Sequence, residues 1–331
     1  MIHPWNADAW QALLGRLERL PHAILISGPQ GIGKFEFSQE LAKRLLCESS
    51  VPGAQACGIC EGCRWFGAQT HPDFRLIEPE ALSSQGGAVA QNDDAEEKSD
   101  AGTKRGKPSS EIRVEQIREL ADFLNIGSHR AGRRIALLHP AERMTQNAAN
   151  SLLKALEEPP SGAVFILVAH NAAHLLPTIR SRCASVTLRV PASEIAADWL
   201  TAQGVANADR WLKFYGGAPL LAREKLVAVR ADSLAALFRA SAVERRRLYG
   251  TLKERDDILR LVDALQKYAL DRALVAAGAA PRYLQMKGAG GSRQDLRKWV
   301  HIARRLGHYR PIATHPLNSS LLINQIFSEI F

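Results

Sequence analysis

AILISGPQGIGKF, residues 23–35, is the stretch that decides which fold this sequence predicts. The apolar run at 23–27 is typical of a buried strand, and the apolar spacing from Glu36 to Cys47 is typical of a helix. A glycine-rich turn between a strand and a helix is the setting of the phosphate-binding motif G-x-x-x-x-G-K-[ST]. The sequence therefore predicts a P-loop within an α/β fold.

The end of this loop departs from the motif. Gly28, Gly31, Gly33 and Lys34 suit a phosphate cradle, but Phe35 stands where a Ser or Thr hydroxyl would bind Mg²⁺. A phenyl ring offers no such ligand, so we expect no Mg²⁺. The loop amides and Lys34 leave open the binding of a nucleotide without turnover.

The next buried strand lacks the acids that hydrolysis needs. A P-loop ATPase carries an acidic residue for Mg²⁺ at the end of a second strand, often with a glutamate that activates water. The strand predicted at 134–138 is instead followed by His139 and Pro140. Glu142 is the nearest acid, and we expect it to be the solvated start of the next helix. The sequence thus predicts no ATPase activity from this chain alone.

Four of the five cysteines form a cluster with metal-ligand spacing. Cys57, Cys60 and Cys63 make a C-x₂-C-x₂-C motif, and Cys47 lies ten residues before it. Four thiolates satisfy a tetrahedral Zn²⁺ and leave no position for a substrate, so we predict a structural zinc site. A reduced, metal-free cluster and an iron–sulfur site are the alternatives, and His71 is a possible substitute ligand.

Alternating strands and helices predict a mainly parallel sheet in the first part of the chain. We predict an α/β domain over 1–190, a small helical domain over 191–231 and a helical domain over 232–331. The cysteine module at about 47–63 interrupts the first domain. So does the stretch at about 81–110, whose composition predicts disorder.

Apolar periodicity and capping residues give the helix boundaries in the first domain. We predict helices at 8–20, at 111–124 with Ser110 as its cap, at 147–157 and at 175–181.

The net charge of +9 is concentrated late in the chain, because residues 241–310 hold 16 Lys and Arg against 7 Asp and Glu. These charges fit either solvated helix faces or a surface for nucleic acid or an acidic partner. The sequence has neither a long apolar run nor a secretion signal, so we expect a soluble, cytoplasmic protein without a membrane partner.

A short basic motif ends the helix predicted at 175–181. From spacing alone, Arg182 is expected to interact with the dipole of that helix, beside Arg180. The following Cys183 is expected to be a small buried apolar residue.

Several of these motifs occur together in one known family. They are the cysteine module behind the P-loop, THPD at 70–73, AANSLLKALEEPP at 148–160 and LPTIRSRC at 176–183. With them, nearly the whole chain resembles the delta-prime subunits of the bacterial DNA polymerase III clamp loader, which are relatives of AAA+ ATPases. The defective ATP site separates delta-prime subunits from the ATPase subunits, gamma or tau.

The resemblance implies an AAA+ P-loop domain, a helical lid and a helical collar domain that joins five subunits. It implies a non-hydrolysing stator that supplies Arg182 in trans, as an arginine finger, to a neighbouring gamma or tau subunit. The other partners implied are the delta subunit, the sliding clamp and primed DNA, within a DNA-directed DNA polymerase holoenzyme that acts in replication. Leu220 and His170 replace residues with which the ATPase relatives sense nucleotide.

Two other functions compete with this interpretation. One is a self-sufficient AAA+ ATPase that uses Lys34 with an unusual metal site, which ATP turnover by the isolated chain would favour. The other is a zinc-dependent DNA-binding module, which tight and salt-sensitive DNA binding by the isolated chain would favour.

Overall fold

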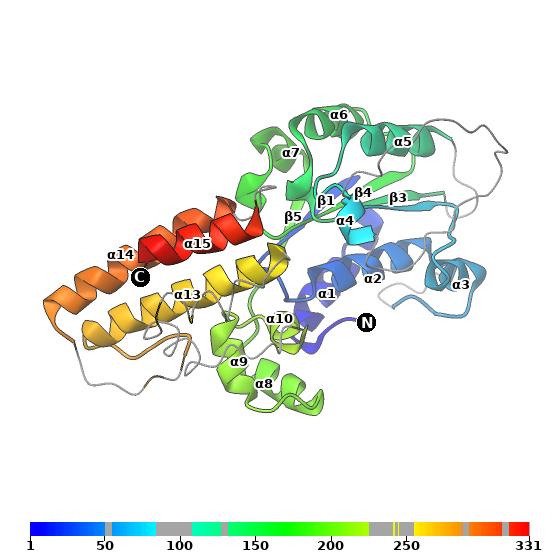
Figure 1. Ribbon diagram of the computed structural model, residues 1–331. Helices are drawn as coiled ribbons and strands as arrows, with labels where there is room; N and C mark the ends of the chain where they lie inside the picture. Colours follow the sequence, from blue (N-terminus) through cyan, green and yellow to red (C-terminus); the bar gives the residue numbers. More distant parts are fainter. Residues whose placement is uncertain are drawn as a thin grey trace. The chain divides into compact units, whose positions relative to one another are not determined.

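The computed structural model describes the following residues: 1–49, 55–83, 108–126, 132–224, 241, 244, 255–284, 286, 291–312 and 318–330. The chain divides into two compact units, Met1–Pro191 and Ala192–Phe331, which are drawn in Figure 1. Most of the stretch predicted to be disordered, and the predicted boundary at 231, lie outside the described residues.

The first unit is built on a five-stranded sheet. Its strands are β1 (Ala23–Ser27), β2 (Phe74–Ile77), β3 (Arg134–Leu138), β4 (Ala163–Ala169) and β5 (Ala184–Thr187). The strand order is β2-β3-β4-β1-β5, and every neighbouring pair is parallel. The apolar runs of β1, β3 and β4 are buried along their whole length, as strands covered on both faces require. The predicted α/β class is confirmed.

Helices cover both faces of this sheet. In chain order they are η1 (Pro4–Asn6), α1 (Ala7–Leu14), η2 (Leu17–Arg19), α2 (Lys34–Leu46), α3 (Glu61–Gly67), α4 (Glu80–Ser83), α5 (Val114–Asn125), η3 (Ala141–Arg143), α6 (Gln146–Glu157), η4 (Ala172–His174) and α7 (Pro177–Arg182). Figure 1 shows α5, α6 and α7 on one face and α1 and α2 on the other. Phe165 and Leu167 of β4 are buried in the same core as Leu120 of α5 and Leu152 of α6.

Two helices differ from their predicted bounds by more than two residues. The helix predicted at 8–20 ends at Leu14, because Gly15 has low helix propensity, and a short 3-10 turn follows it. The helix predicted at 111–124 begins only at Val114, so Ser110 is not its cap. Ile112 instead pairs with Met144 as an isolated bridge, which holds the preceding residues extended.

The described secondary-structure elements of the second unit are helices, as predicted. Its helices are α8 (Ser193–Ala202), α9 (Ala208–Phe214), α10 (Pro219–Glu224), α13 (Arg255–Ala276), α14 (Arg293–Ile312) and α15 (Ser319–Ile330). Leu200, Leu212 and Ala222 form the core of the α8–α10 group, and a larger core joins α13, α14 and α15. None of the helices described here has the length and apolar composition of a membrane span.

Candidate functional site

The P-loop lies between β1 and α2, as the sequence predicts. Gly33 caps α2 in the left-handed region, with φ of 85°, and the helix begins at Lys34. A Cβ on Gly33 would come within 2.3 Å of Cδ2 of His3, so both the backbone angle and the space require glycine. The strand, loop and helix therefore form the frame of a phosphate-binding site.

Lys34 points into its own loop. Its side-chain nitrogen donates to the carbonyl oxygen of Pro29 at 2.5 Å, and the residue is only 3% exposed. Burial lowers the pKa of Lys34 to about 8, although the carboxylates of Glu142 and Glu36 act in the opposite direction. The amine that would hold a phosphate is thus engaged by the loop and is desolvated.

Phe35 fills the region where a metal-binding hydroxyl is needed. Its ring stacks on His139, with 4.5 Å between the ring centroids. His139 contacts Glu78 through Nδ1, 2.9 Å from the carboxylate, and lies edge-on to His170. Burial, together with the nearby Lys34, lowers the pKa of His170 to about 3, so this imidazole is neutral at ordinary pH. Three predicted departures from an ATPase, Phe35, His139 and His170, therefore contact one another in a chain.

Glu142 differs from its predicted role. We expected a solvated helix start, but its carboxylate accepts the backbone N–H groups of His170 at 2.8 Å and Asn171 at 3.3 Å. The acid thus joins η3 to the end of β4, 28 residues later. A carboxylate oxygen that accepts two backbone N–H groups in this way helps to order the loop.

The N-terminal segment braces the P-loop, a contact that no pattern in the sequence indicates. Trp5 and Asn6 both donate from their side chains to the carbonyl oxygen of Ile32, each at 2.9 Å. The ring of His3 stacks on Trp5, with 4.7 Å between the centroids. The signal is invisible in the sequence because the partners lie more than 25 positions apart.

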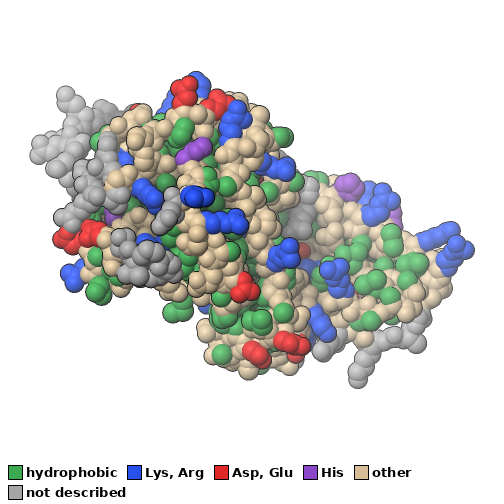
Figure 2. Space-filling view, turned by 180° about the vertical axis from the view of Figure 1, so that it is seen from behind, with side chains coloured by type: hydrophobic (Ala, Val, Ile, Leu, Met, Phe, Trp, Pro, Cys, Tyr) green, Lys and Arg blue, Asp and Glu red, His purple; other side chains and the backbone are tan. Residues whose placement is uncertain are grey.

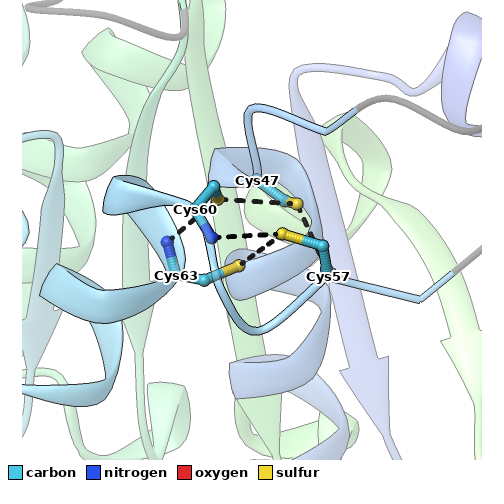
Figure 3. A group of neighbouring side chains, drawn as sticks. All are labelled: Cys47, Cys57, Cys60 and Cys63. Carbon is cyan, nitrogen blue, oxygen red and sulfur yellow. Dashed lines mark hydrogen bonds between the residues drawn. The ribbon is translucent and has the colours of Figure 1, made fainter.

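The four cysteines predicted to bind a metal do lie together (Figure 3). Their sulfur atoms all fall within 4.8 Å of one another, with 3.9 Å between Cys47 and Cys60 and 4.0 Å between Cys57 and Cys63. A tetrahedral site with Zn–S bonds of about 2.3 Å would set its sulfurs about 3.8 Å apart. The observed spacing fits a four-thiolate metal site.

Backbone N–H groups converge on these sulfurs. Cys60 donates to the sulfur of Cys57 at 3.3 Å, and Cys63 donates to that of Cys60 at 3.4 Å. The first of these bonds helps to lower the pKa of Cys57 to about 6, whereas burial raises the pKa of Cys63 to about 12. A cation bound among the four sulfurs would favour the thiolate of Cys63 as well.

His71 is not part of the cysteine group. Its Nδ1 accepts the backbone N–H of Asp73 at 3.1 Å, which makes it a turn residue at the start of β2. Asp73 is fully buried and lies 3.5 Å from Nε of the buried Arg134 at the start of β3. The THPD motif therefore has a structural role, since it fixes the edge of the sheet beside the cysteine module.

Arg182 is the last residue of α7 and is exposed. One terminal nitrogen, Nη2, lies 2.6 Å from Oε1 of Glu157, and the other, Nη1, donates to the carbonyl oxygen of Thr178 at 3.1 Å. Glu157 is the last residue of α6, so two helix ends orient one guanidinium. The next residue, Cys183, is buried as predicted, and burial raises its pKa to about 11.

Comparison with known proteins agrees with this arrangement. A family model described as DNA polymerase III, delta subunit, matches residues 7–192, which include the P-loop, the cysteine group and Arg182. The chain is 37% identical over 226 residues to the DNA polymerase III delta-prime subunit of Pseudomonas aeruginosa, which covers 67% of this chain and 60% of the relative. The delta-prime subunit of Haemophilus influenzae is 32% identical over 68% of this chain and 62% of its own length.

The matched region spans about three fifths of the length of these curated relatives. Among solved structures, a DNA polymerase III gamma subunit-related protein from Thermotoga maritima aligns with 97% of this chain and 98% of its own. The two chains are 20% identical, with a TM-score of 0.46.

Proposed function

The chain belongs to the DNA polymerase III delta subunit family, and from this premise we propose that it is a non-hydrolysing subunit of a clamp loader. In this role it braces a ring of related subunits and gives Arg182 to the ATP site of a neighbouring gamma or tau subunit. The assembly, which includes a delta subunit, loads a sliding clamp on primed DNA in the cytoplasm.

The observation that carries the proposal is the engagement of Lys34 by its own loop. A P-loop lysine acts by placing its charge on the β- and γ-phosphates. Here the amine donates to Pro29, and the ring of Phe35 stacks on His139 where a magnesium ligand would be needed. A chain with these contacts is suited to hold a fixed shape beside an ATPase, and not to hydrolyse ATP itself.

Arg182 supports the second half of the proposal. An arginine supplied to a neighbour's ATP site stabilises the charge that develops on the transferring phosphoryl group, which is worth about 10³–10⁵ in rate. Its guanidinium is exposed at a helix end, and its two contacts use only part of its five donors. The remaining donors are free to bind phosphate oxygens.

For the cysteine group we propose a structural Zn²⁺ held by Cys47, Cys57, Cys60 and Cys63. Metal analysis of the purified chain should give about one zinc atom per chain. Cys60→Ser should lose the metal and loosen α3, while the five-stranded sheet stays folded. Retention of zinc by this variant would remove Cys60 from the ligand set.

Recovery of partners tests the function as a whole. A tagged full-length chain, isolated from the cells that produce it, should bring down the gamma or tau and delta subunits of DNA polymerase III. Adding the purified chain to those subunits should then be required for loading of the clamp on primed DNA. Loading at the full rate without the chain would contradict the proposal.

A further inference from the structure

Helix α14 carries the largest share of the surplus positive charge of the second unit. By sequence it holds six Lys and Arg and one Asp, whereas α13, on which it packs, holds four of each sign. The excess noted in the sequence is therefore not spread evenly over the helical region. Five of the nine surplus positive charges of residues 241–310 lie on this one helix.

The charges of α14 also share one face. At 100° per residue, Arg293, Arg297 and Arg304 fall within about 40° of one another, and all three are exposed. The other exposed basic residues and histidines extend this face to about 140°: Lys298, His301, Arg305 and His308. Trp299, Ile302, Leu306 and Tyr309 occupy the opposite side and are buried against the neighbouring helices. Figure 2 shows Lys, Arg and His side chains over the outer part of the helical bundle.

Nothing in the described part of the chain neutralises the three aligned arginines. No carboxylate there lies within ion-pair distance of Arg293, Arg297 or Arg304. The single acid of the helix, Asp295, accepts hydrogen bonds from the backbone and hydroxyl of Ser292 instead.

This arrangement lowers the stability of the helix. Arg293 and Arg297 stand four residues apart, a spacing at which like charges cost about 0.2–0.5 kcal/mol per pair. A solvated face that served only solubility would gain by mixing the two signs. The uniform sign is the property that a polyanionic partner requires.

We propose that the basic face of α14, defined by Arg293, Arg297 and Arg304 and flanked by Lys298 and Arg305, binds the phosphodiester backbone of DNA. The three aligned arginines span about 16 Å along the helix, which is the axial length of about five phosphates of one strand. Arginine predominates over lysine on this face, and the guanidinium fork matches the geometry of phosphate oxygens. The face contacts backbone only, so binding is independent of base sequence.

The test compares two triple variants of the full-length chain. Arg293→Gln, Arg297→Gln and Arg304→Gln remove the aligned charges. Lys213→Gln, Arg223→Gln and Arg282→Gln remove the same net charge from three other exposed positions of the same unit. Fluorescence anisotropy with a 25-base-pair duplex, a 25-nucleotide single strand and poly-glutamate gives affinities between 50 and 300 mM salt, and circular dichroism checks folding.

The α14 triple should weaken binding of the preferred DNA form by about tenfold or more at 0.1 M salt. Because about three counterions are no longer released, the slope of log Kd against log salt should fall by about 2 to 3. The control triple variant should change the affinity by less than threefold. Comparing the affinities for the duplex and the single strand identifies which form of DNA is bound. Equal loss with both triples, or a preference for poly-glutamate over DNA, would overturn the proposal.

Discussion

The P-loop and the end of α7 differ in how far their charged side chains are exposed. Lys34 is 3% exposed and is bound by its own loop, whereas the side chain of Arg182 is 36% exposed at a helix end. The residue that an ATPase would use on its own nucleotide is thus turned inward. The residue that another subunit could use remains accessible. The two regions therefore differ in the solvent accessibility of the charged side chain, more than in the presence of a motif.

The largest effect should come from removing Arg182. Arg182→Ala should slow hydrolysis at the neighbouring ATP site of the assembled complex by about 10³-fold, because the developing phosphoryl charge loses its partner. Assembly should be unchanged, because the residue is exposed and pairs only at the surface. DNA-stimulated ATPase of the reconstituted complex measures the first effect and gel filtration the second.

Arg180→Ala is the matched control, since Arg180 is an exposed cation of the same helix. It should leave the ATPase rate within about twofold of the parent. An equal loss of ATPase rate with both variants would mean that the rate depends on the total charge of the helix and not on the guanidinium of Arg182.

A smaller effect, on the free energy of unfolding, is expected when Lys34 is replaced. Burial lowers the pKa of this amine to about 8 from 10.5, so the folded state binds fewer protons than the unfolded state between these values. The stability of the parent should therefore gain from this group as pH rises from 8 to 10.5. Lys34→Met, of similar shape, should lose that gain and be more stable by about 1–3 kcal/mol at pH 7.

Urea unfolding of parent and variant at pH 7 and pH 10 measures this difference. The ATPase of a complex that contains Lys34→Met should equal that of the parent. If Lys34→Met is less stable than the parent at pH 7, the charged ammonium of Lys34 stabilises the fold.

A substitution at Phe35 tests whether the P-loop can regain ATPase activity when the hydroxyl of the motif is restored. Phe35→Thr restores the hydroxyl of the motif but removes the stack on His139, which should cost about 1–2 kcal/mol in the free energy of unfolding. No Mg²⁺-dependent turnover should appear, because His139 and Pro140 still supply no acid. Chemical denaturation and an ATPase assay on the isolated chain check both results. Turnover by this single variant would show that one residue alone had disabled the site.

The smallest effect should come from the partner of Arg182. An exposed ion pair contributes about 0.2–1 kcal/mol, so Glu157→Gln should lower the ATPase of the complex by up to about fivefold through poorer orientation of the guanidinium. The same change should have no effect in an Arg182→Ala background, as a double-mutant cycle requires. Glu158→Gln is the control, and an equal effect there would exclude a role for the pair.

The sequence predicts what depends on local pattern. Apolar runs gave β1 and β3 with their observed bounds, and cysteine spacing gave the four-sulfur group, because both features lie within a short segment. The roles of Glu142 and Asn6 could not be predicted, since their hydrogen bonds join segments more than 25 residues apart. The role proposed for Arg182 comes from the family's motif and not from spacing, and its contact with Glu157 could be seen only in the structure.

The most direct test of the central claim is the steady-state rate of ATP hydrolysis by the purified chain alone, measured beside Lys34→Met. Inward engagement of Lys34 predicts no turnover above background in either protein, with or without primed DNA. Turnover by the parent that Lys34→Met abolishes would contradict the account, because it would show a working ATPase where we propose an inactive one.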